Sequence, residues 1–336
     1  MDALKQIDSQ NMRDMVTNFP QLLHPMDIGN PIEDAIKEFQ TQGISGLAFV
    51  GMGGSAISGS YISSLLRDKV EIPITVVRTY TLPKYVTKNW VLIAISYSGN
   101  TEETLSSLKS ALDEKIRTIC ITSDGMMKKN SRVQISLPEG IQPRAAFPLI
   151  FSTALTLAER LLFGKSTDFE VVSRKLQEKT SSWGSLLPEP KKLASLFVDK
   201  IPLYIGSGYL TPVAYRAKCQ INENAKHPSF ASELPEANHN EIEGFDSPLK
   251  QSILPIFLIG KNEHPRIKRR IETTFNIYEK MNVQSLKLQI DCESTIEEML
   301  SMTHYLDMVS VELAEIKGVN PVSVDRITDL KQRLSR

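Results

Sequence analysis

The 336-residue chain lacks the marks of several large classes of protein. Its 39 Lys and Arg residues balance 39 Asp and Glu residues, so no net charge attracts it to nucleic acid or to an anionic membrane. No apolar run approaches ~20 residues, so no membrane-spanning helix is expected. The first 15 residues have no apolar signal-peptide core. These absences predict a soluble globular protein without a nucleic-acid or membrane partner.

Cysteine and metal-ligand patterns are also sparse. The three cysteines, Cys120, Cys219 and Cys292, are scattered and show no C-x-x-C spacing. An odd set of isolated thiols is typical of a reducing compartment, so we expect the protein in the cytoplasm. The histidines show no H-x-x-x-H spacing and accompany no aspartate cluster, so neither a metal nor another cofactor is expected.

One segment carries much of the chemical information. Residues 91–95 are all apolar, which predicts a strand buried on both faces. Ser96, Ser98 and Thr101 follow directly, before a helix with three leucines on one face. Hydroxyls beside the backbone N–H groups at a positive helix end can bind an anion. Three hydroxyls in six residues exceed what a capped turn needs, which favours a ligand.

A second loop of this kind follows an earlier strand. After the apolar residues 47–50, Gly53, Gly54 and Ser55 lead into a helix, and the glycines let the backbone approach a bound group closely. Read as Gly-x-Gly-x-x-Ala, residues 51–56 also match the relaxed dinucleotide fingerprint. The next strand ends in Arg78 instead of an acidic residue, so an NADP-dependent oxidoreductase remains an alternative. A P-loop is excluded at this turn, because no Gly-Lys-Ser/Thr follows its glycines.

Strands and helices alternate along the chain, which predicts an α/β fold with a doubly wound parallel sheet. Both hydroxyl loops follow strands, and such sheets bind ligands at the carboxyl ends of their strands. Further strands are expected at residues 118–122 and 133–137. After a helical connection, residues 201–208 echo residues 47–53. We therefore expect two copies of one α/β unit, with the anion loops kept only in the first.

Several of these segments resemble a known family. They are residues 51–60, 96–101, 143–144, Glu223 and 237–241, and together they resemble the sugar isomerase (SIS) fold. More closely, they resemble the bifunctional phosphoglucose/phosphomannose isomerases, over most of the chain. The resemblance implies two SIS-type doubly wound subdomains, each a parallel sheet flanked by helices. Residues 1–152 would carry the phosphate loops, residues 153–318 the catalytic base and histidine, and residues 319–336 a C-terminal helix returning to the active site.

The resemblance implies an aldose–ketose isomerase. It would interconvert glucose 6-phosphate, and mannose 6-phosphate, with fructose 6-phosphate by proton transfer through an enediolate. Glu223 would be the base and Arg144 would stabilise the enediolate. His239, reaching across a homodimer, and Lys331 would assist ring opening. The phosphate would be held by Gly53, Gly54, Ser55, Ser96, Ser98 and Thr101.

The residues themselves support part of this assignment. Glu223 ends a predicted helix, where the negative end of the helix dipole makes a carboxylate a stronger base. His239 lies in a polar loop without helical period, which favours a functional histidine. Glu233, Glu236 and Glu241 could also serve as the base, and only the resemblance separates them from Glu223. A non-catalytic sugar-phosphate sensor with the same fold is the alternative, although the chain shows no DNA-binding helix-turn-helix or basic patch.

Overall fold

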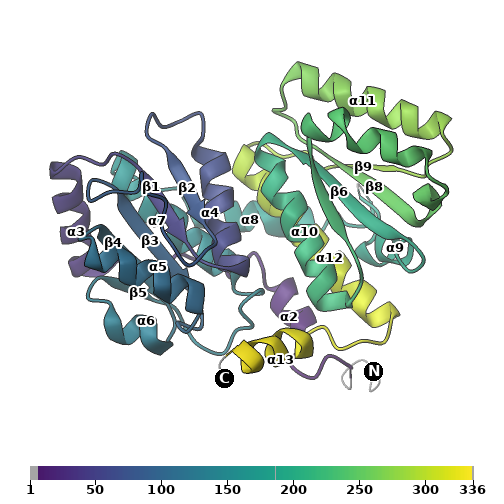
Figure 1. The fold of residues 1–336 in the computed structure, drawn as a ribbon. Coiled ribbons are helices and arrows are strands. Elements are labelled where there is room, and N and C mark those ends of the chain that lie inside the picture. Colours follow the sequence, from purple (N-terminus) through teal and green to yellow (C-terminus); the bar gives the residue numbers. More distant parts are fainter. Residues whose placement is uncertain (1–6, 186, 335–336) are drawn as a thin grey trace. The chain divides into compact units, whose positions relative to one another are not determined.

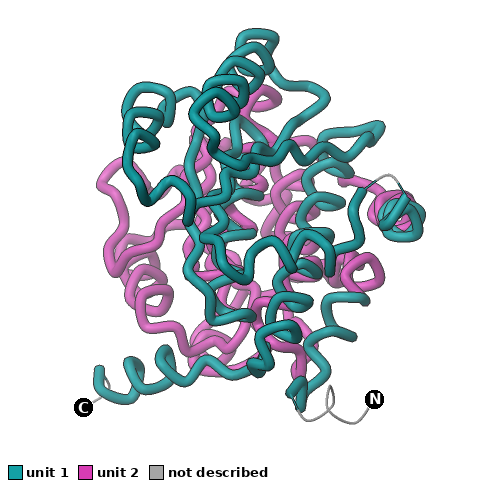
Figure 2. The backbone as a smooth tube through the Cα atoms, turned by 90° about the vertical axis from the view of Figure 1, so that its right-hand side faces the viewer, with its two compact units in different colours: residues 1–17, 176–336 teal, residues 18–175 magenta. Residues whose placement is uncertain are grey.

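The structure is a computed structural model that describes residues 7–185 and 187–334 (Figure 1). The chain forms two compact units, one of Asn18–Lys175 and one of Leu176–Arg336 with the N-terminal residues up to Thr17 (Figure 2). Helix α8 (Phe169–Thr180) carries the chain from one unit to the other. The expected boundary at residue 152 lies within helix α7 (Phe147–Phe163). The three-part functional division therefore stays a prediction, separate from this division by contacts.

A parallel five-stranded sheet forms the centre of the unit Asn18–Lys175, in the order β2-β1-β3-β4-β5. The apolar run at residues 91–95 falls in the central strand, which is buried along its whole length between two neighbours because both faces are covered. The prediction of a parallel α/β sheet is thus confirmed. The strands are β1 (Leu47–Val50), β2 (Ile74–Val77), β3 (Val91–Ser96), β4 (Arg117–Thr122) and β5 (Gln134–Ser136).

Helices flank this sheet (Figure 1). The Tyr61 ring of α4 meets the Phe147 ring of α7 edge-on, with centroids 5.0 Å apart, so these helices pack through aromatic side chains. Of the three leucines expected on the buried face of the helix after β3, Leu108 is buried, Leu105 is half-buried and Leu112 is 48% exposed. The prediction is wrong for Leu112, because the buried face runs through Ala111 instead. The helices are α3 (Gly29–Thr41), α4 (Gly53–Leu66), α5 (Glu102–Asp113), α6 (Gly125–Asn130) and α7.

The other unit repeats the plan with a parallel four-stranded sheet in the order β7-β6-β8-β9, as the internal repeat predicts. Its strands are β6 (Ile201–Ser207), β7 (Phe230–Leu234), β8 (Ile253–Ile259) and β9 (Leu286–Gln289). Its α-helices are α2 (Met12–Thr17), α9 (Pro190–Ser195), α10 (Thr211–Ala225), α11 (Pro265–Lys280), α12 (Thr295–Ile316) and α13 (Asp325–Leu334). Short 3-10 helices are η1 (Gly208–Leu210), η2 (Glu236–His239), η3 (Glu241–Asp246) and η4 (Pro248–Ser252).

Helix α12 is the central helix of this second unit. It is buried over most of its length, and α10 packs against it. Arg216 of α10 and Asp307 of α12 form an ion pair of 2.6 Å with both side chains 2% exposed. Removing one partner of such a pair would leave an uncompensated buried charge and destabilise the packing of the two helices. No helix in the described part of the chain has the length and apolar character needed to cross a membrane.

Candidate functional site

The order of the first sheet predicts where a ligand binds. From β1 the chain continues to β2 at one edge of the sheet, and from β3 it continues to β4 and β5 towards the other edge, so the strand order reverses between β1 and β3. Parallel sheets bind ligands at such a reversal, outside the carboxyl ends of the strands. Val50 of β1 pairs with Ala94 of β3, so the two strands end close together. The two hydroxyl-bearing turns predicted from the sequence therefore begin side by side.

The turn after β3 holds a pair of hydroxyl groups. Ser96 Oγ lies 2.9 Å from Thr101 Oγ1, with Ser96 buried and Thr101 half-buried. Thr101 is the N-cap residue of α5, yet its side chain makes no capping hydrogen bond. The pair thus leaves the first N–H groups of α5 without a side-chain acceptor, as an anion-binding helix end requires. Ser98 is exposed, and its Oγ accepts from the N–H of Asn100 at 3.4 Å.

Close packing fixes the shape of this turn. Gly99 has φ +67°, and a Cβ atom there would lie 1.6 Å from the carbonyl oxygen of Asp124, so only glycine fits. The Asn100 Oδ1 accepts from the N–H of Met126 at 3.0 Å, which ties the turn to the start of α6. The hydroxyl groups are therefore held in place before any ligand arrives.

The turn after β1 contributes glycines, a serine and a neighbouring arginine. α4 begins at Gly53 without a side-chain cap, and Ser55 lies buried in its first turn. A Cβ atom on Gly54 would lie 4.0 Å from Arg144 Cα, so the backbone of Arg144 passes close to the first turn of α4. Arg144 is 7% exposed. The first unit thus brings the predicted Gly53, Gly54, Ser55 and Arg144 together.

Glu223 lies in the other unit, in the last turn of α10, where the sequence places it. The helix around it is held on both sides, by the Arg216–Asp307 pair and by Asn224, whose Nδ2 donates to Ser310 Oγ at 2.8 Å. Lys226, in a left-handed conformation at φ +47°, ends the helix, and its Nζ donates to the Glu223 carbonyl oxygen at 2.9 Å. Glu223 is half-buried on a rigid support.

His239 is the last residue of η2 and is exposed. The asparagines on both sides of it are anchored. Asn238 Nδ2 donates to Thr274 Oγ1 of α11 at 2.8 Å, and Asn240 Oδ1 accepts from the N–H of Glu241 at 2.6 Å. The structure therefore presents the His239 imidazole at the surface on a fixed backbone.

Lys331 lies on α13, none of whose described residues is buried. An ion pair of 3.0 Å joins Arg333 and Asp329 within the same helix. Lys331, Glu223 and His239 thus all belong to the second unit, whereas the phosphate loops and Arg144 belong to the first.

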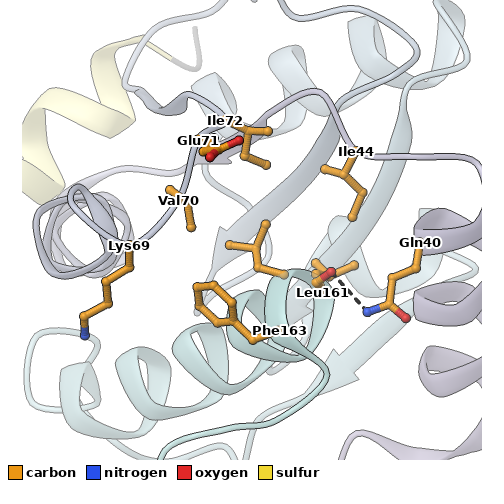
Figure 3. A pocket seen from close by; sticks show the side chains of 9 residues that line it. Gln40, Ile44, Lys69, Val70, Glu71, Ile72, Leu161 and Phe163 are labelled. Carbon is orange, nitrogen blue, oxygen red and sulfur yellow. Dashed lines mark hydrogen bonds between the residues drawn. The ribbon is translucent and has the colours of Figure 1, made fainter.

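Two further features bear on where a ligand could sit. A hollow of about 490 Å³ in the first unit is lined by residues just before β1 and β2 and by the end of α7 (Figure 3). It lies at the amino-terminal edge of the sheet, opposite to the edge at which such folds bind ligands. Among residues 7–185 and 187–334, no three His, Cys, Asp or Glu side chains cluster as metal ligands would.

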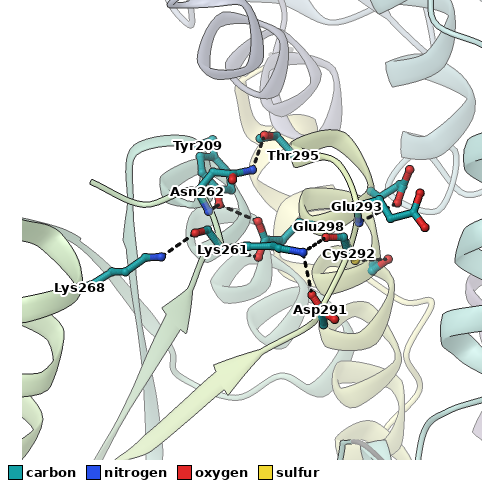
Figure 4. Close-up of polar contacts among 11 residues, drawn as sticks. Tyr209, Lys261, Asn262, Lys268, Asp291, Cys292, Glu293, Thr295 and Glu298 are labelled. Atoms are coloured by element: carbon teal, nitrogen blue, oxygen red, sulfur yellow. Dashed lines mark hydrogen bonds and ion pairs between the residues drawn. The ribbon is translucent and has the colours of Figure 1, made fainter. Parts of the chain in front are cut away.

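A polar cluster in the second unit was not foreseen from the sequence. Glu298 of α12 is 1% exposed and accepts two hydrogen bonds, from the Tyr209 hydroxyl at 2.6 Å and from the Lys261 N–H at 2.8 Å (Figure 4). Tyr209 follows β6 and Lys261 follows β8, so the carboxylate bridges the two turns at the carboxyl edge of this sheet. Glu298 on the buried face of an apolar helix was the signal that could have revealed it.

The comparisons with known proteins first define a class. Residues 45–163 match the family model of the SIS domain, and residues 188–334 match that of the bacterial phospho-glucose isomerase C-terminal SIS domain. The C-terminal domain of glucosamine-fructose-6-phosphate aminotransferase from Francisella tularensis has a similar fold, with a TM-score of 0.72 over 95% of this chain and 99% of that one at 14% identity. Both units are thus SIS-type units, as expected.

Sequence relatives then define the family. A bifunctional phosphoglucose/phosphomannose isomerase from Aquifex aeolicus is 34% identical over 87% of this chain and 91% of its own length. A D-glucosamine-6-phosphate 4-epimerase from Sulfolobus acidocaldarius is 35% identical over 63% of this chain and 68% of its own length. The chain belongs to the family of bifunctional phosphoglucose/phosphomannose isomerases.

Proposed function

We propose that the protein is an aldose–ketose isomerase that interconverts glucose 6-phosphate and mannose 6-phosphate with fructose 6-phosphate. The observation that carries this proposal is the Ser96–Thr101 hydroxyl pair beside an α5 N-terminus without a side-chain cap, in a chain of this family. A phosphate ester meets there hydroxyl and N–H donors and the positive end of a helix. Ser55, with Gly53 and Gly54 at the start of α4, supplies donors from the adjacent turn, and Ser98 lies at the rim.

The chemical step is a proton transfer between C1 and C2 of the open-chain sugar. Glu223 takes the proton from C2 of the aldose, an enediolate forms, and Glu223 returns the proton to C1 to give the ketose. Arg144 stabilises the negative charge on the C1 oxygen. A proton passes from the C2 hydroxyl to the C1 oxygen, so C2 becomes the ketone carbonyl and C1 a CH2OH group with no net change of protons or electrons. The rigid anchoring of α10 keeps the Glu223 carboxylate in position for both transfers.

Ring opening precedes this step, because both hexose phosphates are mainly cyclic. It requires a proton for the ring oxygen and removal of one from the anomeric hydroxyl. His239 and Lys331 serve here in our proposal. The exposed His239, held between two anchored asparagines, suits a group that reaches the active site of another subunit. We therefore propose a homodimer in which His239 acts across the interface, in the cytoplasm.

The test is an assay with glucose 6-phosphate and mannose 6-phosphate side by side, each with and without EDTA, with fructose 6-phosphate formation followed by NMR. We expect turnover of both and no effect of EDTA, because hydroxyl and N–H donors hold a monophosphate without Mg²⁺. Glucosamine 6-phosphate serves as a control for epimerisation at C4. Binding of fructose 6-phosphate without any aldose formed would contradict the proposal and favour the non-catalytic sensor.

A further inference from the structure

Three arginines lie on one stripe of α11. Arg266, Arg269 and Arg270 are spaced three and four residues apart, and Thr273 continues the same face. They border a hollow of about 340 Å³ in the second unit. The hollow is lined by Asn238, Ile242, Arg266, Arg269, Arg270, Thr273, Thr274 and Ile277. It therefore contains three cations and no carboxylate.

None of these guanidinium groups is neutralised within the described residues. The structure gives none of the three an ion pair in residues 7–185 and 187–334, whereas Glu272 of the same helix pairs with Lys287 at 2.5 Å. The arginines occupy the first two turns of α11, where the helix dipole repels cations. Like charges three and four residues apart add further repulsion. A bound anion would relieve this repulsion.

We propose that this hollow is a second anion site, which takes a small molecule bearing phosphate groups. Arginine is suited to it, because the planar guanidinium binds two phosphate oxygens at once. The volume of about 340 Å³ lies at the lower end of the range for small-molecule sites, roughly 300–1,000 Å³. The hydroxyl of Thr273 and the amide of Asn238 add polar groups to the lining.

The site adjoins the segment that carries His239. Asn238, which lines the hollow, donates to Thr274 Oγ1 at 2.8 Å, and Thr274 is 4% exposed. An anion held by Arg269 and Arg270 therefore lies next to the residue preceding His239 in the chain. The imidazole of His239 reports on occupancy whether or not it takes part in catalysis, so the proposal stands apart from the isomerase activity.

The test is a calorimetric titration of the full chain with pyrophosphate, and with fructose 1,6-bisphosphate, at low ionic strength. The variants are Arg269→Gln with Arg270→Gln, Ser96→Ala with Thr101→Ala, the four changes combined, and Lys191→Gln with Lys192→Gln as a charge-matched control on exposed residues of α9. We expect pyrophosphate to bind the Ser96→Ala, Thr101→Ala protein, and the added arginine changes to weaken binding at least tenfold. The lysine changes should weaken pyrophosphate binding less than twofold, since they remove only a long-range, screened attraction.

Each outcome decides the proposal. A pyrophosphate-dependent shift of the His239 imidazole NMR signals, lost in the arginine variant, supports it. Tighter binding of the bisphosphate identifies a sugar phosphate as the ligand, and tighter binding of pyrophosphate an inorganic anion. Equal weakening by the arginine and lysine changes overturns it. The proposal is also overturned if the arginine changes dissociate a dimer and leave the pyrophosphate affinity unaltered. That result would mean that the arginines contact a second copy of the chain. If only the arginine changes remove a site, this proposal stands and the Ser96–Thr101 phosphate site fails.

Discussion

At the carboxyl edge of the first sheet, the turn after β3 presents the hydroxyls of Ser96 and Thr101, whereas the corresponding turns of the second sheet meet the carboxylate of Glu298. In both units, polar groups converge where two neighbouring parallel strands end. In the first unit they are hydroxyl groups, which in our proposal bind the substrate phosphate. In the second, a buried carboxylate from α12 already bridges the turns after β6 and β8.

The same fold thus has hydroxyl groups at the carboxyl edge of one sheet and an internal carboxylate at that of the other. An internal carboxylate accepts the hydrogen bonds of the second edge and repels any further anion. Glu263, 8% exposed at the same edge, has a pKa raised by burial, so a second carboxyl group lies shielded from solvent there. In our proposal the second unit contributes catalytic groups from elsewhere, namely the end of α10 and the η2 segment. Four experiments probe this division.

The largest effect is expected from Glu223→Gln. If the second unit supplies the base, kcat should fall roughly 10³-fold, because general base catalysis contributes about 10²–10⁴-fold and the amide cannot accept the proton. Steady-state kinetics with glucose 6-phosphate measure kcat, and a titration with fructose 6-phosphate should show unchanged affinity.

The matched control is Glu236→Gln, because Glu236 is an exposed carboxylate of the same unit that accepts from Asn240 Nδ2 at 3.0 Å. It should keep kcat within about twofold, as expected of a surface change. A control that lost as much activity as Glu223→Gln would mean that the base had been misassigned.

The second experiment removes the hydroxyl pair at the carboxyl edge of the first sheet. One hydroxyl of the Ser96–Thr101 pair donates to the other, which leaves one donor for a charged group, worth about 1.5–3 kcal/mol. Ser96→Ala with Thr101→Ala should therefore raise KM roughly 10-fold to 100-fold, while kcat changes less. Ser106→Ala with Ser110→Ala is the control, because these hydroxyls of α5 donate to the carbonyl oxygens of Tyr80 and Ser106 instead. Equal KM values for wild type and the Ser96, Thr101 variant would place the phosphate elsewhere.

The contrast between the edges also shows what the sequence could reveal. Residues 91–101 were predictable because a buried strand, a glycine turn and a helix start are all local signals. The pairing of Ser96 with Thr101 was not, since a hydroxyl at an N-cap position normally caps its own helix.

The position of Glu298 on an apolar helix signals a buried carboxylate, but its partners Tyr209 and Lys261 could not be predicted, because they are distant along the chain. For the same reason, only the family resemblance distinguishes Glu223 from the neighbouring carboxylates. The local elements that form a site can thus be read from one sequence, whereas the role of a single carboxylate depends on contacts formed by the fold.

The third experiment removes the buried carboxylate at the carboxyl edge of the second sheet. Glu298→Ala leaves the Tyr209 hydroxyl and the Lys261 N–H without their acceptor, and it creates a cavity. The free energy of unfolding should fall by about 2–4 kcal/mol. Urea unfolding followed by circular dichroism measures this change, with the exposed Glu279→Gln as the control. KM for glucose 6-phosphate should stay near the wild-type value, and a large rise in KM with unaltered stability would show that Glu298 binds substrate.

The smallest effect is a loss of stability in acid, which we expect to differ between the two units. His304 of α12 is 1% exposed, 4.9 Å from the Trp183 ring, and burial lowers its pKa from 6.5 to about 3. The unfolded chain therefore takes up a proton below pH 6.5 that the folded chain refuses. The resulting stability is present above pH 6.5 and decreases by about 1.4 kcal/mol per pH unit below it.

His24, which is exposed, is the only histidine of the first unit, so acid should destabilise the second unit first. His304→Gln removes the titrating group and can keep the contact of 3.3 Å with Thr180 Oγ1. Hydrogen exchange of the amides of α12 and β3, compared at about pH 7 and about pH 5, measures each unit separately. Wild type should lose protection in α12 alone, and His304→Gln should lose less. Equal loss in β3 would mean that the two units unfold together and that the histidine does not distinguish them.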